Sequence, residues 1–182
     1  CRELTAAQRS AKMQQRRPAW RIKVDDELIA FTDMHYGRQQ AILANECGDF
    51  ILRRSDGVYA YQLAVVIDDA LMGVNQVVRG CDLLSSTPVQ LYLYRLLNLT
   101  PPSFCHIPLL TDAAGRRLSK RDGDLEIAAL RQHFGSPEPI IGLLAYLAGQ
   151  LPKPEPITAA ELLPLFRPEV VPHDNIVVPQ LL

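Results

Sequence analysis

Long apolar runs are absent from this sequence of 182 residues. No uninterrupted stretch approaches the roughly 20 residues that a membrane-spanning helix needs. The first residues also lack the order of charged, apolar and small residues that is typical of a signal peptide. Hydrophobic residues make up 48% and charged residues 21% of the chain, which excludes a disordered or fibrous protein. We therefore expect one soluble globular domain with no membrane partner.

Cysteine is scarce, and its spacing excludes a complete zinc site within the sequence. The four cysteines lie too far apart for a Cys-x-x-Cys pair; they are Cys1, Cys47, Cys81 and Cys105. Disulfides are not expected without secretory signals. Cys81 and Cys105 are therefore predicted to be buried apolar side chains, and the cytoplasm is the expected compartment.

The net charge of −1 averages two unlike regions. Residues 1–23 hold seven basic side chains against one acid, so this segment carries about +6. A basic arm of this kind can bind phosphate, and an anionic partner such as nucleic acid is one explanation. A solvated helix face explains the same charge. Charge alone leaves both interpretations open.

Periodicity and turn signals predict an alternation of strands and helices. Thr5 and Gln8 have the spacing of a capping box that opens a basic helix, and Thr87 and Gln90 have the same spacing before a later helix. Strands are expected at 19–24, 28–32, 49–54, 74–79 and 104–110, and helices at 63–72, 89–97, 125–134 and 139–151. This order predicts an α/β fold that ends, after residue 168, in an irregular tail.

The loop from Gly115 to Gly123 concentrates four cations within six positions, beside a hydroxyl group. Its glycines free the backbone, and mobile cations can close over the charge that develops on a polyphosphate during transfer. A basic surface hairpin has the same composition. The loop is therefore a candidate phosphate site with a purely structural alternative.

Arg79 ends an apolar strand, at the sheet edge where α/β proteins bind ligands. Its planar guanidinium matches the geometry of a carboxylate. An ion pair with Asp68 or Asp69 is the structural alternative. The residue types alone do not decide between a substrate carboxylate and one of these side chains.

The loop sequence Arg117-Leu118-Ser119-Lys120-Arg121 resembles the KMSKS signature of class I aminoacyl-tRNA synthetases, in the leucine-containing form of the glutamyl and glutaminyl branch. Other motifs are similar to the glutamyl branch, in the same order, over nearly the whole chain. They are Tyr61, Asp68-Asp69, Gly73, Val78-Arg79-Gly80 and Ser86-Thr87-Pro88 before the loop, and Leu130-Arg131, Phe134-Gly135, Pro137 and Ile141-Gly142-Leu143-Leu144-Ala145 after it.

This resemblance implies the later half of a class I Rossmann-like catalytic fold with a small C-terminal helical extension. Residues 1–23 would then be the end of a possible zinc-bearing insertion and a basic helix. Residues 24–123 would form the second part of the catalytic domain, and residues 124–182 the helical extension and the tail.

The resemblance also implies ATP-dependent activation of L-glutamate, with Mg²⁺, followed by transfer to tRNA. The residues matching Tyr61 and Arg79 contact glutamate in this family, and the lysine matching Lys120 is the catalytic residue on the ATP phosphates. The rest of the ATP-binding loop is Arg117, Leu118, Ser119 and Arg121. Because glutamate's own carboxylate attacks the α-phosphorus, the protein needs no nucleophile and mainly positions reactants and neutralises charge.

Two departures from the family pattern limit the comparison. Arg117 and Arg121 stand where the signature has lysine and serine, and the His-x-Gly-His motif is absent. That motif normally lies upstream, and the sequence begins at Cys1 without methionine, so we expect a longer protein. Cys1-Arg2 resembles the end of a zinc-bearing insertion, which makes Cys1 an expected zinc ligand.

The end of the sequence resembles the glutamyl-Q branch, which attaches glutamate to the queuosine base at the wobble position of tRNA(Asp). We therefore expect this transfer, carried out by a monomeric enzyme. The first alternative is a catalytic-region fragment of an enzyme that charges tRNA(Glu). The second is a non-catalytic RNA-binding remnant built around the basic residues 1–23.

Overall fold

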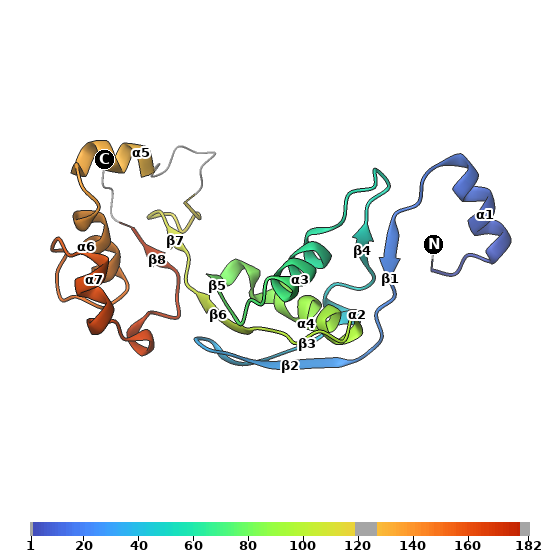
Figure 1. Cartoon of the computed structure of the whole chain (residues 1–182), viewed down its shortest axis with the longest axis horizontal. Helices are drawn as coiled ribbons and strands as arrows, with labels where there is room; N and C mark the ends of the chain where they lie inside the picture. The colour runs from blue at the N-terminus through green and yellow to red at the C-terminus, as the bar shows by residue number, and fades with distance from the viewer. Residues whose placement is uncertain (1, 119–126, 179–182) are drawn as a thin grey trace. The chain divides into compact units, whose positions relative to one another are not determined.

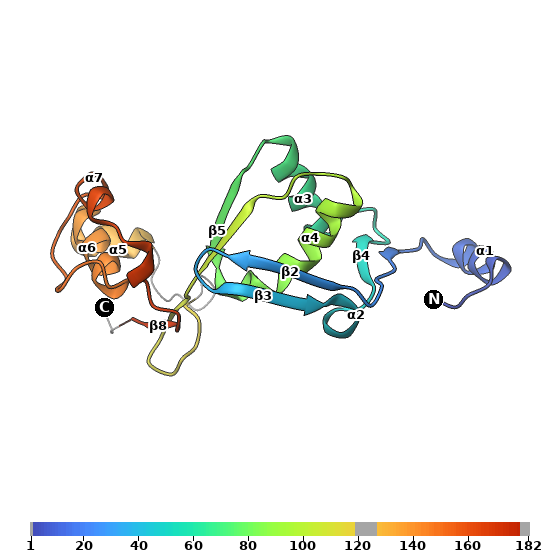
Figure 2. The same cartoon turned by 90° about the horizontal axis from the view of Figure 1, so that it is seen from below.

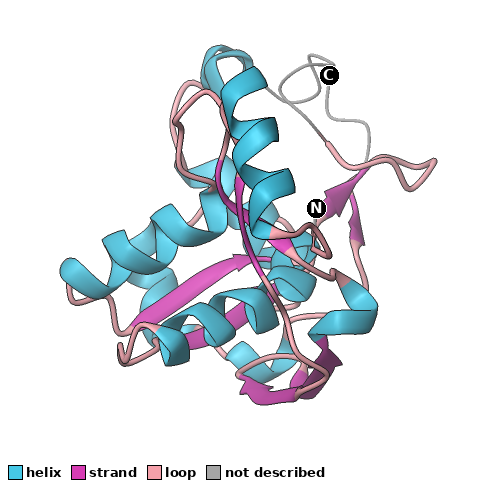
Figure 3. Cartoon of the chain, turned by 90° about the vertical axis from the view of Figure 1, so that its right-hand side faces the viewer, coloured by secondary structure: helices cyan, strands magenta, loops and turns pink. Residues whose placement is uncertain are grey.

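The computed structural model describes residues 2–118 and 127–178 (Figure 1). The chain divides into two compact units, the first made of residues up to 78 and residues 83–105, the second of residues 79–82 and 106 onward. Helices and strands are mixed along the chain, as predicted for an α/β fold (Figure 3). None of the described helices is long and apolar enough to cross a membrane. The expected domain boundaries at residues 23 and 123 stay a prediction.

The first unit begins with a helix that no core contact holds in place. The predicted capping box closes the start of α1 (Ala6–Gln15): the Thr5 backbone N–H donates to Gln8 Oε1 at 2.9 Å, and the Gln8 backbone N–H donates to Thr5 Oγ1 at 3.3 Å. None of its ten residues is buried. Capping therefore stabilises α1 locally while its side chains remain exposed to solvent.

Four strands of the first unit form two antiparallel pairs. β1 (Trp20–Ile22) pairs with β4 (Phe50–Arg53), and β2 (Leu28–Asp33) pairs with β3 (Gly37–Ile42), which precedes the short α2 (Leu43–Glu46). β3 was not predicted, because Gly-Arg-Gln-Gln gives no apolar alternation. The Asp33 carboxylate turns the chain into β3 by accepting the backbone N–H of His35 at 3.0 Å and of Tyr36 at 2.9 Å.

Two helices build the core of the first unit. α3 (Tyr61–Leu71) and α4 (Thr87–Leu96) lie within two residues of their predicted bounds. Figure 2 shows α4 between α3 and the β2–β3 hairpin, and α4 contacts both. Buried side chains form two clusters, made of Val24, Ile29, Leu43, Val89 and Tyr92 in one and Val66, Leu93 and Tyr94 in the other.

The predicted capping box at the start of α4 is wrong. The N-cap residue is Ser86, which makes no side-chain cap bond, and Thr87 is already inside the helix. Thr87 and Gln90 are both fully buried. The Gln90 amide donates to Gln62 Oε1 of α3 at 2.7 Å, because a buried amide must find its partner in the core rather than at the helix end.

β5 (Gln76–Gly80) lies next to β6 (Ser103–Ile107) in a two-stranded sheet, and the 3₁₀ helix η1 (Cys81–Ser86) follows β5 directly. In the second unit β7 (Leu110–Thr111) pairs in parallel with β8 (Ile176–Val177). The tail is therefore not irregular as predicted, since it contains β8 and the 3₁₀ helix η4 (Pro168–Val170). A two-residue strand whose partner lies more than 60 positions away gives no local periodicity to read.

The remaining helices among the described residues lie in the second unit. They are α5 (Ile127–Phe134), α6 (Glu138–Leu147), α7 (Ala159–Leu162) and the 3₁₀ helix η3 (Leu163–Leu165). Gly142 lies on the buried side of α6, where a β-carbon would meet the Glu155 carbonyl oxygen at 1.8 Å. The segment at Glu155 therefore packs directly against the helix backbone.

We predict that Gly142→Ala destabilises the protein by about 1–3 kcal/mol, because the added methyl group has no space beside Glu155. Thermal and urea unfolding of the protein that contains this chain measure the change. Gln132→Ala, at an exposed position of α5, is the control and should leave unfolding unchanged. Equal stability of Gly142→Ala and wild type would contradict the close packing described above.

Candidate active site

Arg79 lies near the end of β5 and is half-buried. Its Nε donates a hydrogen bond to Nε2 of His106, on the neighbouring strand β6, at 3.0 Å. His106 is completely buried. Asp68 and Asp69 were the partners weighed from the sequence, but Nε of the guanidinium faces this histidine. No sequence signal pointed to His106, since the contact depends on which strand lies beside β5.

The residues directly after Arg79 contact the loop that contains the KMSKS-like sequence, residues 115–123, which we call the signature loop. Gly80 leaves space for the side chains of Asp82 and Leu109. A β-carbon at position 80 would lie 2.6 Å from Asp82 Oδ1 and 2.8 Å from Leu109 Cδ2. The Asp82 carboxylate forms an ion pair with the guanidinium of Arg117. One of the loop cations is therefore held at the strand end that carries Arg79.

The first part of the signature loop is a hairpin. Thr111 of β7 bridges to Arg117, and the Leu118 backbone N–H donates to the Leu110 carbonyl at 3.1 Å. Asp112 stabilises the turn, because its carboxylate accepts Arg116 Nε at 3.0 Å together with the backbone N–H groups of Arg116 at 2.8 Å and Ala114 at 3.0 Å. The side-chain bond from Arg116 is the main cause that lowers the pKa of Asp112, assisted by the backbone bonds.

The predicted site residues that the structure describes belong to both units. Arg79 and Arg117 belong to the second unit, and both lie next to the segment of residues 80–82. Tyr61 opens α3 in the first unit, where its side chain is 55% exposed. Leu118 is half-buried in the hairpin. Ser119, Lys120 and Arg121 lie outside the described residues, as does Cys1.

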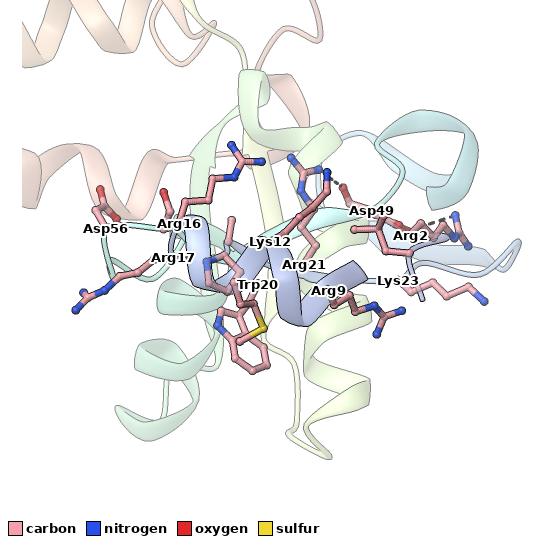
Figure 4. A pocket seen from close by; sticks show the side chains of 15 residues that line it. Arg2, Arg9, Lys12, Arg16, Arg17, Trp20, Arg21, Lys23, Asp49 and Asp56 are labelled. Carbon is pink, nitrogen blue, oxygen red and sulfur yellow. Dashed lines mark hydrogen bonds and ion pairs between the residues drawn. The ribbon is translucent and has the colours of Figure 1, made fainter. Parts of the chain in front are cut away.

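A second feature, which we call the basic groove, lies on the N-terminal side of the first unit. Seven cations line it: Arg2, Arg9, Lys12, Arg16, Arg17, Arg21 and Lys23. Figure 4 shows these side chains together with that of Trp20, a residue that is 62% exposed. Of these seven, within the part of the chain that the structure describes, only Arg2 forms an ion pair, with Asp49 at 3.5 Å.

Sequence reasoning identified the charge of this groove but gave Trp20 no role. Trp20 begins β1, so the backbone of a strand fixes it while its ring remains accessible. An exposed aromatic ring among cations is the combination that binds single-stranded nucleic acid, because bases stack on the ring and phosphates pair with the charges. The signal that could have found it is the position of the only tryptophan between Arg17 and Arg21.

The metal and cysteine predictions have different outcomes. Residues 2–118 and 127–178 contain no group of three His, Cys, Asp or Glu side chains that could hold a metal ion. Cys1, the expected zinc ligand, lies outside these residues, and zinc binding there stays a prediction. Cys81 and Cys105 were predicted to be buried, but both are only half-buried, and burial raises the pKa of the Cys105 thiol.

In α/β folds ligands bind at the carboxyl ends of strands, and Arg79 and the ion pair of Arg117 lie at such an end. Residues 1–163 match the family described as tRNA synthetases class I (E and Q), catalytic domain. The chain belongs to this family.

Curated relatives cover almost all of the chain. It is 50% identical over 180 residues to the glutamyl-Q tRNA(Asp) synthetase of Nitratidesulfovibrio vulgaris, a match that covers 98% of this chain and 56% of the relative. The enzyme of the same name from Symbiobacterium thermophilum is 46% identical over 180 residues, covering 98% of this chain and 55% of the relative. The chain therefore spans about half the length of the curated relatives that it matches.

Solved structures share the fold. The glutamate-tRNA synthetase of Elizabethkingia anophelis superimposes with a TM-score of 0.76 at 24% identity, covering 97% of this chain and 40% of that one. A glutamate tRNA ligase from Elizabethkingia meningosepticum, in complex with its amino acid, gives 0.73 at 24% identity, covering 96% and 39%. The predicted α/β fold of a class I catalytic domain is confirmed.

We predict that Arg116→Ala raises the pKa of Asp112 toward that of an ordinary aspartate. The bond lowers this pKa in the folded state, so its stabilisation of the hairpin is present above the ordinary aspartate pKa and is lost as the pH falls through the lowered value. Carboxyl-carbon NMR titration measures it. Arg117→Ala, whose partner is Asp82, is the control. The same midpoint in Arg116→Ala and wild type would refute the assignment.

Proposed function

We propose that the protein containing this chain activates L-glutamate with ATP and transfers the glutamyl group to the queuosine base at the wobble position of tRNA(Asp). The observation that carries this proposal is the match over 98% of the chain to two relatives named glutamyl-Q tRNA(Asp) synthetase. The family supports a synthetase-type ligase. The hairpin of residues 110–118, which we call the signature hairpin, is tied through Asp82 to the strand end at Arg79. This geometry supports glutamate activation by ATP.

In the proposed reaction, Arg79 pairs with the side-chain carboxylate of glutamate and Tyr61 contacts the amino acid. A planar guanidinium can donate two parallel bonds to a carboxylate, whereas the amide of glutamine would leave part of this charge unpaired. Arg79 therefore selects an acidic substrate. Both the charge and the planar shape of the guanidinium then discriminate glutamate from glutamine.

In the activation step the protein orients glutamate and ATP and does not itself form a covalent bond with either. The α-carboxylate of glutamate attacks the α-phosphorus of ATP, a new C–O–P bond forms, and the bond to pyrophosphate breaks. Lys120 neutralises the charge on the phosphates, with Arg117 and Arg121 assisting and Leu118 and Ser119 completing the loop. The Asp82 ion pair with Arg117 supports this role by holding the base of the loop at the strand end.

Mg²⁺ accompanies ATP in this proposal and neutralises phosphate charge when it is bound. Zinc at Cys1 stays a prediction that rests on the Cys1-Arg2 resemblance alone.

The RNA is proposed to bind at the basic groove. Six of its seven cations have no carboxylate partner among the described residues, so their charge is available to phosphates. Trp20 offers a face on which an unpaired base can stack. This supports RNA binding rather than a simply solvated helix face, because the cations and the indole together offer contacts to both phosphates and bases.

The competing proposal, charging of tRNA(Glu), is less well supported. The solved glutamate-tRNA synthetases are only 24% identical to this chain, against 50% and 46% for the two relatives named above. A non-catalytic RNA-binding remnant would not need the signature loop or Arg79.

A direct transfer assay tests the proposed function. We expect the intact protein to transfer labelled glutamate to queuosine-containing tRNA(Asp), and not to tRNA(Glu) or to tRNA(Asp) without queuosine. Lys120→Ala should lower ATP–pyrophosphate exchange at unchanged thermal stability, since the residue acts on the phosphates. Charging of tRNA(Glu) only would reject the proposal, and no glutamate-dependent exchange would favour the remnant.

The basic groove has its own test, in which RNA affinity is measured by fluorescence anisotropy over a series of salt concentrations. We expect Trp20→Ala to weaken tRNA binding by about 1–3 kcal/mol, while Trp20→Phe retains most of the affinity. Replacing Lys12 and Arg16 with glutamine should lower the salt slope by about 2. Lys153→Gln, outside the groove, is the matched control. An unchanged slope and affinity would remove the groove from the RNA site.

A further inference from the structure

His106 is a completely buried side chain to which no function has been assigned. It lies in β6, between two half-buried or exposed neighbours, Cys105 and Ile107. Its Nε2 receives the hydrogen bond from Arg79 Nε at 3.0 Å. A fully buried imidazole has little freedom to rotate in a packed interior. The ring therefore presents a fixed acceptor to the guanidinium.

The chemistry of this bond determines the form of the ring. Arginine Nε–H can only donate, so Nε2 of His106 must accept with its lone pair, and the ring proton of the neutral imidazole lies on Nδ1. The bond uses one of the five N–H donors of Arg79. It fixes the guanidinium at the Nε end, nearest to the flexible aliphatic part of the side chain.

We propose that His106 is a positioning residue that orients the guanidinium of Arg79 for the side-chain carboxylate of glutamate. This inference rests on the proposed function, in which Arg79 binds that carboxylate. Bidentate pairing requires the guanidinium and the carboxylate to lie nearly in one plane. A guanidinium held in place before the substrate arrives loses less conformational freedom on binding, so the affinity for glutamate is higher.

A purely structural role for His106 makes a different prediction. If the ring only fills space, an apolar side chain of similar size should preserve glutamate binding. If the acceptor at Nε2 matters, glutamine should replace histidine best, because its carbonyl oxygen reaches about as far along the side chain as Nε2. Asparagine is the matched control, since it is polar but shorter and places its oxygen near the position of Nδ1.

The experiment measures glutamate affinity by calorimetry, and KM and kcat by ATP–pyrophosphate exchange, in the intact protein and four variants: His106→Gln, His106→Asn, His106→Leu and Arg79→Ala. We expect the KM for glutamate to rise about tenfold in the Leu and Asn variants, with the KM for ATP unchanged. The Gln variant should recover most of the loss. Thermal unfolding identifies any variant that fails to fold, and the Gln and Asn pair then decides the question.

Each outcome separates this inference from the proposed function. Loss of glutamate binding in Arg79→Ala but wild-type binding in His106→Leu overturns the positioning role and leaves the role of Arg79 intact. Equal losses in the Gln and Asn variants overturn it too, because a general packing defect then explains both. Unchanged binding in Arg79→Ala overturns both assignments.

Discussion

The site depends on the four residues Arg79–Asp82, where β5 ends. Arg79 bonds to the buried His106, Gly80 leaves space that a β-carbon would fill, and Asp82 pairs with Arg117 of the signature hairpin. A proposed glutamate-binding side chain and a proposed ATP-binding loop are thus fixed to one short backbone segment. A shift of this segment would move both, and a side chain at position 80 would displace Asp82 or Leu109.

Charge is used differently in the two parts of the molecule. In the signature hairpin Arg116 and Arg117 form ion pairs with Asp112 and Asp82, and these pairs help to order the hairpin while the Arg117 side chain stays largely exposed. In the basic groove six of the seven cations have no carboxylate partner among the described residues. Paired cations order a loop, whereas unpaired cations increase the attraction for phosphate. The near-neutral net charge of −1 hides this division.

Local signals in the sequence predicted most of the helices and the charged loop. The capping box at Thr5 and the apolar runs of α3 and α4 act within a few residues, so they can be read without the fold. Pairings between distant segments could not be read. Examples are β8, whose partner β7 lies more than 60 residues away, and Gln90, whose partner Gln62 lies in another helix.

The site was predicted in the same uneven way. Arg79 and the loop carry family motifs that are contiguous in sequence. Residues 1–163 match the catalytic-domain family, and the roles of Arg79 and of the loop residues stay predictions. His106 and Asp82 contact residues that lie 27 and 35 positions away in the sequence. Nothing in their own surroundings in the sequence distinguishes them from core or surface residues. Trp20 required knowing that its ring is exposed beside the cations of α1.

The identity of the partner at Arg79 Nε also has a physical consequence. A carboxylate at the same place would orient the guanidinium but would add negative charge beside the proposed carboxylate substrate. A neutral imidazole orients it through a hydrogen bond and adds no charge. Burial of the ring then matters twice, because it fixes the acceptor geometrically and keeps water from competing for the Nε–H donor. Through this hydrogen bond the His106 ring can orient the guanidinium without adding a negative charge of its own.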